Sequence, residues 1–407
     1  MQNKSMLISK ESGKSVGAVD EQAGYLIFPE GEYATRLNNV RRDMAAQNID
    51  ACLITVPENI YYLAGLDHWG FFAYHVLIVP KEGEMVLIAR AMEQVTMDNQ
   101  IAPRARFVGY KDFEDPAEIT AGVLKGMGVS KDVLGLEKHS VYQPLKVVEG
   151  IKAICPDAAW VDIGLMVDLL RRIKSPIEQI YARQAANVSD AMMQAAIAAV
   201  HSGANEREIA AETYRAMVLA GGEYPSFGPF IRPTSRLGEE HTTWGNSILK
   251  KGDALFLEMS GCVRRYHAPM GRIVYIGEAP EGTKEIERVC LAAFDAVVST
   301  IRPGVTANTV YKSWQDQVDS AGLSHYQRHH CGYMVGSSFP PGWCGVGVPV
   351  GLRKGSELEL KEGMTFHLLS WLMGTGRGDY FISNTVLVNE TGCEVLTNQT
   401  PRELKVV

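Results

Sequence analysis

The sequence predicts an α+β protein of two domains, an α/β domain followed by a larger domain built from two similar halves. Three observations lead to this prediction. Helix and strand patterns alternate through the first third of the chain, a helix-start signal follows them, and one later stretch recurs 101 residues further on. The 407 residues suffice for two cores, and 46% hydrophobic with 21% charged residues is typical of globular proteins.

The N-terminal domain is predicted from alternating local patterns. Residues 33–50 place apolar side chains on one helical face, and residues 51–56 form a short apolar run typical of a buried strand. The apolar runs 75–79 and 84–89 flank a Pro-Lys-Glu-Gly segment, which predicts a hairpin with a four-residue loop. Residues 132–137 have the pattern of another strand. Together these segments indicate an α/β domain.

The domain boundaries are predicted from composition and from one helix-start signal. The first 24 residues are polar and lack an apolar core, and we expect residues 1–28 to form a flexible N-terminal arm. Ser175 suits a helix cap and Pro176 suits the first helical turn, so a long helix is expected over 176–202. The expected domains are therefore residues 29–173 and residues 174–407.

The second domain contains an internal duplication. The stretch 199–222 parallels the stretch 299–322, and superposing Gly203 on Gly304 also superposes the Ala-Gly pairs that end the two stretches. Each copy has the pattern of a helix end, a glycine turn and a second helix. We therefore expect a pseudo-two-fold domain.

Bulk properties exclude several classes of function. The net charge of −7 gives no basic footprint for nucleic acid, and no run of 18 apolar residues predicts a membrane span. The first residues lack the apolar core of a signal peptide. Seven cysteines without regular spacing fit reduced thiols. The sequence thus predicts a cytoplasmic protein that binds neither nucleic acid nor membrane.

Residues 257–272, LEMSGCVRRYHAPMGR, carry the most informative motif. They resemble the central hairpin of the creatinase/methionine-aminopeptidase superfamily, which is the M24 family with the pita-bread fold. The resemblance covers about residues 30–400. It implies a creatinase-like N-terminal domain, a C-terminal pita-bread domain with its site in a cleft, and a homodimer in which each N-terminal domain covers the partner's site.

The resemblance also maps five metal-ligand positions onto this chain. The metallopeptidases of the family place an Asp at two hairpin positions eleven residues apart, where this chain has Glu258 and Pro269. The family's His position holds Tyr333, and its two Glu positions hold Leu369 and Ser383. Two divalent ions need several carboxylates to offset their charge. The resemblance therefore implies a branch that works without metal and without another cofactor.

Two residues are the candidate catalytic pair. His241 precedes the hairpin at the spacing of the cleft histidine that the family links to proton transfer, and imidazole titrates in the right range for a general base and acid. A lone histidine is otherwise more often a hydrogen-bonded wall. Glu258 is expected to point into the cleft and to hold the N–H groups of a cationic substrate. Alternatively, Glu258 pairs structurally with Arg264 or Arg265.

A finer resemblance, to ectoine hydrolases, is carried by several short segments. These are residues 57–65, 220–224, 258–266, 331–333 and 339–343. The resemblance implies hydrolysis of a C–N bond in a small cationic or zwitterionic osmolyte, an ectoine-like cyclic amidine first and a creatine-like guanidino compound second.

Further candidates would line the substrate site. The expected substrate-binding residues are Tyr333, His330, His367, Trp69, Phe71, Phe227, Trp343 and Arg377. The family dimer would make Trp69 and Phe71 contacts to the partner's site. A substrate carboxylate could bind Arg232, Arg236, Arg272, Arg328 or Arg377, and the sequence does not choose among them.

Several alternatives stay open at this stage. The histidines His267, His329, His330 and His367 could hold one unusual metal ion with Glu258. The reaction could be a lyase cleavage of dimethylsulfoniopropionate or an Xaa-Pro dipeptidase-like hydrolysis. The chain could also be a binding protein without catalytic activity.

Overall fold

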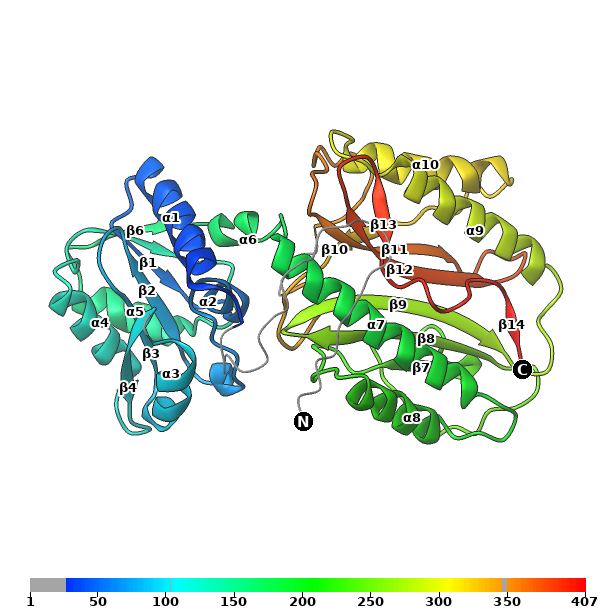
Figure 1. Ribbon diagram of the computed structural model, residues 1–407, viewed down its shortest axis with the longest axis horizontal. Helices are drawn as coiled ribbons and strands as arrows, with labels where there is room; N and C mark the ends of the chain where they lie inside the picture. Colours follow the sequence, from blue (N-terminus) through cyan, green and yellow to red (C-terminus); the bar gives the residue numbers. More distant parts are fainter. Residues whose placement is uncertain (1–26, 103, 346–349) are drawn as a thin grey trace, which may run out of the picture.

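A computed structural model describes residues 27–102, 104–345 and 350–407. The chain forms two lobes, each built on one β-sheet (Figure 1). Since residues 1–26 are outside the described part, the predicted N-terminal arm lies there almost entirely.

The first lobe contains a six-stranded sheet in the order β4-β3-β2-β1-β5-β6. Its strands are β1 Ala51–Ile54, β2 Val76–Pro80, β3 Met85–Arg90, β4 Ala105–Tyr110, β5 Val133–Leu136 and β6 Ala159–Asp162. Its helices are α1 Glu30–Ala46, α2 Pro57–Ala64, α3 Gln94–Gln100, α4 Pro116–Gly126, α5 Leu145–Ile154 and α6 Met166–Leu170.

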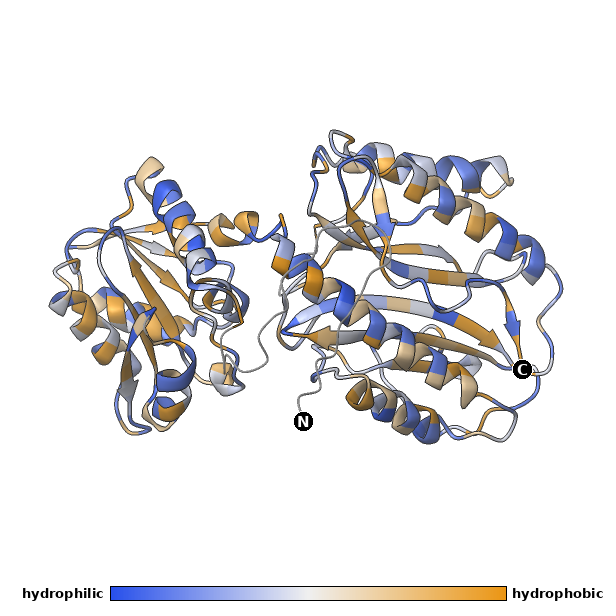
Figure 2. Cartoon of the chain, in the orientation of Figure 1, coloured by the Kyte–Doolittle hydropathy of each residue, from blue (hydrophilic) through white to orange (hydrophobic). Residues whose placement is uncertain are grey.

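The strands predicted for this lobe are confirmed where the apolar runs were strongest. The run 51–56 forms β1, and the runs 75–79 and 84–89 form the antiparallel pair β2–β3. Gly83 in the connecting loop has φ of 88°, a left-handed conformation that glycine adopts without steric cost. The central strands are apolar along their length, as Figure 2 shows.

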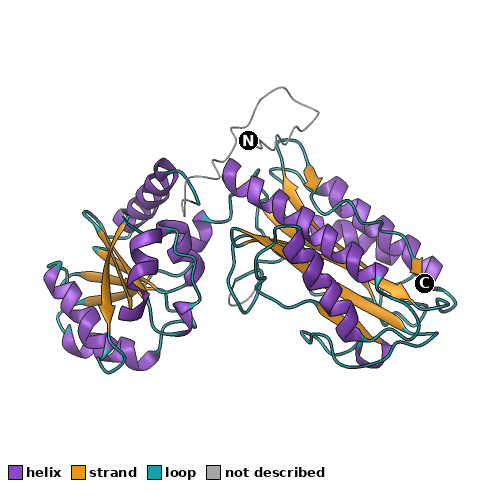
Figure 3. Cartoon of the chain, turned by 60° about the horizontal axis from the view of Figure 1, so that its bottom comes forward, coloured by secondary structure: helices purple, strands orange, loops and turns teal. Residues whose placement is uncertain are grey.

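The second lobe contains an eight-stranded sheet with β10-β11-β12-β9-β8-β7 as its main path. Its strands are β7 Phe230–Pro233, β8 Ala254–Val263, β9 Tyr266–Tyr275, β10 Gly332–Met334, β11 Thr365–Leu372, β12 Tyr380–Val388, β13 Cys393–Val395 and β14 Lys405–Val406. Its helices are α7 Pro176–Ala198, α8 Glu206–Leu219, α9 Thr283–Thr300 and α10 Ala307–Ser320. These helices run alongside the sheet (Figure 3).

The predicted helix start at Ser175 and Pro176 is confirmed. The backbone N–H of Glu178 donates to the Ser175 hydroxyl at 3.3 Å, and the backbone N–H of Ser175 donates to the Glu178 carboxylate at 2.8 Å. This reciprocal pair is a capping box. The helix ends at Ala198, four residues before the predicted end.

The predicted internal duplication is confirmed by matching hydrogen bonds. The N–H of Gly203 donates to the Leu249 carbonyl at 2.8 Å, and the N–H of Gly304 donates to the Leu360 carbonyl at 2.9 Å. Both glycines are left-handed, with φ of 91° and 85°. Each half therefore supplies a helix pair followed by strands of the common sheet.

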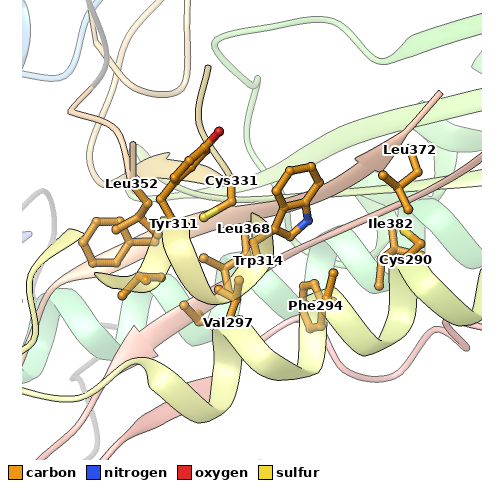
Figure 4. Packing of buried hydrophobic residues seen from close by; sticks show 14 of the residues in the cluster. Cys290, Phe294, Val297, Tyr311, Trp314, Cys331, Leu352, Leu368, Leu372 and Ile382 are labelled. Atoms are coloured by element: carbon orange, nitrogen blue, oxygen red, sulfur yellow. The ribbon is translucent and has the colours of Figure 1, made fainter. Parts of the chain in front are cut away.

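Apolar side chains at alternate positions along the strands pack against the helices of the second lobe. Leu257 and Met259 of β8 pack in a cluster with residues of α7 and α8. Phe294 of α9 and Trp314 of α10 pack against Leu368 of β11 and further strand residues (Figure 4). Residues at the intervening strand positions, such as Phe256 and Glu258, consequently face away from the helices.

The two lobes are joined by hydrogen bonds between buried groups. Glu58 of α2 is fully buried, and its carboxylate accepts from the Phe339 N–H at 3.0 Å and from the Ser338 hydroxyl at 3.2 Å. Tyr142 donates to the Pro340 carbonyl at 2.7 Å. The first lobe thus holds residues 337–345, the segment that follows β10.

Among the described residues, no helix is both long and apolar enough to span a bilayer.

Candidate active site

Positions on four neighbouring strands lie in a row across the surface of the sheet that faces away from the helices. Glu258 of β8 is the cross-strand partner of Gly271 on β9, Gly271 is the partner of Ser383 on β12, and Ser383 is the partner of Leu369 on β11. Pro269 lies two residues before Gly271 and therefore shares this side. We call this surface the site face. It carries four of the five positions that the sequence mapped from the family's metal ligands.

The fifth position, Tyr333, is also on the site face. Tyr333 of β10 is the cross-strand partner of His367, which lies two residues before Leu369 on β11. The Tyr333 hydroxyl lies 2.9 Å from Nδ1 of His367 and accepts from Nε1 of Trp343 at 2.8 Å. Nε2 of His367 lies 3.7 Å from Oε1 of Glu258. A chain of polar groups therefore runs from Trp343 to Glu258.

Burial sets the protonation of this pair. Burial raises the pKa of Glu258 to about 8; Arg232 and Arg328 oppose that rise, whereas Glu240 adds to it. Burial lowers the pKa of His367 to about 3. Near neutral pH, Glu258 is therefore mostly a neutral acid beside a neutral imidazole.

Several buried polar atoms of the site face lack a partner. Within the described part of the chain, Oε1 of Glu258, Nε2 of His367, Oγ of Ser383 and Nδ1 of His330 make no hydrogen bond. An unpaired buried polar atom costs about 1–3 kcal/mol. A ligand that offers donors and acceptors here would relieve that cost.

His241 lies at an exposed edge of the same region. Its ring stacks on Phe227 with centroids 6.2 Å apart and meets Phe230 edge-on at 6.1 Å. Phe230 is the cross-strand partner of Glu258, and Phe227 packs on Trp343 at 4.8 Å. The two catalytic candidates are therefore linked through one aromatic side chain. The φ of His241 is 54°, an uncommon value for a residue other than glycine.

Glu258 forms no ion pair with Arg264 or Arg265, the structural alternative to its role in the site. Arg265 pairs with Glu223 at 2.6 Å and with Asp67 at 3.3 Å instead. Arg264 is exposed at the turn between β8 and β9. Neither arginine neutralises Glu258.

The side chains of the site face do not fit a two-metal centre. Pro269 and Leu369 offer no donor atom, and Ser383 and Tyr333 offer neutral hydroxyls. Burial holds the pKa of Tyr333 well above its ordinary value, so its phenol does not supply a charge. One carboxylate remains, which cannot offset the charge of two divalent ions.

The alternative of a single metal ion held by histidines finds no suitable cluster either. In residues 27–102, 104–345 and 350–407, no three His, Cys, Asp or Glu side chains are arranged to hold a metal ion. His267 is engaged elsewhere, because its Nδ1–H donates to the Arg265 carbonyl at 2.8 Å and its Nε2 accepts from the Ser226 N–H at 3.0 Å.

Other predicted binding residues divide into two groups. His330 is partly buried, and its ring meets Tyr333 edge-on at 5.4 Å, so it belongs to the site face. Arg377 lies elsewhere, because its guanidinium donates to Glu285 and to the Ala321 carbonyl on the side of α9 and α10. The expectation that Arg377 binds substrate is therefore not supported by its contacts.

The aromatic residues predicted in the first lobe differ in exposure. Phe71 is buried between Phe339 and Tyr142 of its own chain, at centroid distances of 5.5 and 5.8 Å. Trp69 is 56% exposed and packs on Tyr224 at 4.4 Å. Trp69, rather than Phe71, thus has a ring exposed to solvent.

Sequence reasoning missed Phe230 and Phe256 on the site face. Phe256 lies two residues before Glu258 on β8, so the two-residue strand period would have placed both on one side. No comparable signal marks Phe230, since its place depends on the pairing of β7 with β8.

Comparisons with known proteins agree with this architecture. Residues 181–390 match the model of metallopeptidase family M24, and residues 36–173 match the creatinase/prolidase N-terminal domain. The chain is 29% identical to the ectoine hydrolase of Halomonas elongata over 94% of this chain and 98% of that protein. It is 25% identical to an Xaa-Pro dipeptidase of Pyrococcus furiosus over 91% and 99%.

Solved structures show the same fold at lower identity. An Xaa-Pro dipeptidase from Bacillus anthracis superposes with a TM-score of 0.80 at 21% identity, covering 92% of this chain and all of that one. The N-terminal domain of the FACT subunit SPT16 from chickpea, Cicer arietinum, superposes with a TM-score of 0.73 at 12% identity, covering 92% and 98%.

Proposed function

Because the chain belongs to metallopeptidase family M24, we propose that it is a hydrolase that cleaves a C–N bond of a small amidine or guanidino compound without a metal ion. One observation carries this proposal. The site face offers a single carboxylate, Glu258, among neutral side chains at the positions where the family's peptidases bind metal. The likeness to ectoine hydrolase supports a cyclic amidine as the first substrate to test.

The proposed substrate class follows from the charge of the site. A neutral amide requires a Lewis acid or an oxyanion hole before water attacks it. An amidinium or guanidinium already carries positive charge, and a carboxylate can accept its two N–H groups side by side. A bound cation would also favour the ionised form of Glu258, because it lowers the pKa of an adjacent acid.

The proposed reaction is a single hydrolysis with His241 moving the proton. His241 accepts a proton from water as the water oxygen bonds to the amidine carbon. His241 then donates that proton to the leaving nitrogen as the C–N bond breaks. A cyclic amidine opens to one product that carries an amide and an amine and contains the atoms of the amidine and one water, whereas a guanidino compound gives urea and an amine. His367 lies beside Glu258, and Tyr333 holds the His367 ring in place.

Chelation tests the proposal. The purified protein is dialysed exhaustively against a chelator, and hydrolysis of ectoine and of creatine is followed by product release. Undiminished turnover is expected. An Xaa-Pro dipeptidase treated identically serves as the control, since it should lose activity and regain it with metal. Activity of the present protein that disappears and returns with Mn²⁺, Fe²⁺ or Zn²⁺ would contradict the proposal.

An Xaa-Pro dipeptidase-like hydrolase is the second candidate, because dipeptidases are among the chain's relatives in sequence and in fold. Hydrolysis of Gly-Pro with and without added Mn²⁺ tests it. The same preparation can be assayed for dimethyl sulfide release from dimethylsulfoniopropionate, which tests the lyase alternative.

We also propose a homodimer in which Trp69 reaches the partner's site. Light scattering should then give twice the chain mass of 44.7 kDa.

A further inference from the structure

One edge of the six-stranded sheet in the first lobe is open. The edge strand β4 pairs along all of Ala105–Tyr110 with β3, and with no other strand among the described residues. Outside that pairing, the backbone hydrogen bonds of the described chain include none made by residues 106–110. An edge strand of this kind presents a row of unpaired N–H and C=O groups to which another strand can add.

A groove of about 460 Å³ lies between this edge and helix α4. It is lined by Val108 of β4, by Ile119 and Val123 of α4, and by Met127 directly after α4, and all four are half-buried. Covering their remaining apolar surface would be favourable, by about 25 cal/mol for each Å² removed from water. The edge therefore offers apolar side chains as well as backbone groups.

The flank of α4 that borders the groove lacks side chains at two positions. Gly122 and Gly126 are one helical turn apart and exposed, and a Cβ added at either would meet nothing within 4 Å. A glycine inside a helix costs about 0.5–1 kcal/mol relative to alanine. Since helices pack about 8–10 Å apart depending on the side chains at the contact, this bare flank allows a second helix to approach closely.

A second copy of the chain has the shape that this surface requires. When two copies meet edge to edge about a two-fold axis, β4 of one copy pairs antiparallel with β4 of the other. Both α4 helices then lie on the same face of the joined sheets, side by side across the axis. Each helix presents its glycine flank to the other, and the apolar side chains of both grooves are covered.

The charges of the groove are complementary under the same symmetry. Arg106 lies near the start of β4 and Glu118 in the first turn of α4, and both line the groove. Only residues 111–115 separate strand from helix, so α4 runs back along β4 and the two charges lie at opposite ends of the groove. Within the described chain, Arg106 pairs only with Glu84, at 3.7 Å on the surface, and Glu118 forms no ion pair. The two-fold axis brings Arg106 of each copy to the end that carries Glu118 of the other.

We propose that the β4 edge and the α4 flank form an interface through which two copies of this chain join their six-stranded sheets. The edge of six residues is about 20 Å long at 3.3 Å per residue. That length places the contact among small interfaces, below about 1,200 Å², so the copies should associate reversibly as the concentration rises. The surface lies at the end of the first lobe away from the second lobe (Figure 1), whereas Trp69 packs on Tyr224 of the second lobe.

Sedimentation of the full chain from dilute to concentrated solution tests the interface. The mass should double, whichever unit the dilute protein forms, so the result depends neither on the proposed function nor on the dimer through Trp69. The amide hydrogens of residues 105–110 should exchange more slowly in the concentrated solution. A mass that stays constant would leave the groove to a different partner and overturn the inference.

Gly122→Glu separates the interface from the fold. The variant should melt no lower than the wild type in dilute solution, because its Cβ meets nothing within 4 Å and glutamate is the better helix former. It should weaken self-association by at least about tenfold, since it places two carboxylates opposite each other. Gly31→Glu is the matched control, at an exposed glycine of α1 that also has nothing within 4 Å. Equal effects of the two variants, or no effect of Gly122→Glu, would overturn the inference.

A charge exchange tests the two-fold pairing itself and decides the question if Gly122→Glu does not fold. Arg106→Glu and Glu118→Arg each bring like charges together across the axis, so each should weaken self-association by about tenfold or more. The double variant restores opposite charges and should recover the association of the wild type to within about threefold. Single variants without effect, or a double variant as weak as the single ones, would overturn the interface.

Discussion

At the scale of single residues, the buried acid Glu258 makes the stability of the fold depend on pH. Its pKa of about 8 in the folded chain lies above the value near 4.5 for an exposed Glu. The folded state therefore holds a proton that the unfolded chain releases as pH rises. Stability from this group is fully present below pH 4.5 and is lost as the pH rises through about 8.

The first prediction is that Glu258→Gln flattens this pH dependence. Glutamine keeps the shape without the ionisation, so the variant should gain stability relative to wild type between pH 5 and 9, by on the order of a few kcal/mol. Melting temperatures across that range measure it. Parallel melting curves of the two proteins against pH would contradict the raised pKa. Asp43→Asn, at a partly exposed acid on α1, is the control.

The second prediction concerns His241. His241→Ala should lower turnover by about 10²- to 10⁴-fold, the usual contribution of a general base. Affinity for the substrate should stay nearly unchanged, because Glu258 remains. Steady-state kinetics with a binding titration separate the two quantities. His201→Ala, at an exposed histidine before α8, should leave both unchanged. Full turnover by His241→Ala would exclude the proposed base.

At the scale of elements, the capping box of Ser175 and Glu178 sets the residue at which α7 begins. The helix packs against both β8 and β9, so the residue at which it begins determines where the second lobe starts.

The third prediction is that Ser175→Ala lowers the free energy of unfolding by about 1 kcal/mol, since it removes an N-cap acceptor. Thr306→Ala, at the cap of α10, is the matched comparison and should cost a similar amount. Denaturant unfolding of both variants measures the change. A loss below about 0.3 kcal/mol at Ser175 would contradict the role of the cap.

Much of the element order could be predicted from the sequence, and the gaps have physical causes. Continuous apolar runs predicted β1, β2 and β3, and a helix-cap signal predicted α7. The strand β6 was not predicted, because its side chains are half-exposed and lack a clear period. The contact between Tyr333 and His367 was also out of reach, since the register of β10 on β11 joins segments 34 residues apart.

At the scale of the whole molecule, the buried carboxylate of Glu58 is one of several groups that join the two lobes. Glu58 of the first lobe holds the backbone of Phe339, and the same segment carries Trp343, which donates to Tyr333 on the site face.

The fourth prediction is that Glu58→Ala uncouples the lobes. Loss of the acceptor leaves the buried N–H of Phe339 unpaired, which should cost about 1–3 kcal/mol, whereas the Ser338 hydroxyl keeps the Gly342 carbonyl as an acceptor. Calorimetry should show a lower transition, and ectoine turnover should fall although Glu58 does not touch the site face. Glu118→Ala, at an acid on the outer helix α4, should change neither. Unaltered turnover in Glu58→Ala would contradict the coupling.

Because the sheet is duplicated, the functional groups of the site are divided between the two halves of the second domain. The first copy supplies the acid Glu258 and the imidazole of His241, and the second supplies the imidazole of His367 and the phenol of Tyr333. Neither copy therefore contains all the functional groups of the site. Two polypeptides produced by cutting the chain between β9 and α9 would be inert apart, and activity would report their reassembly.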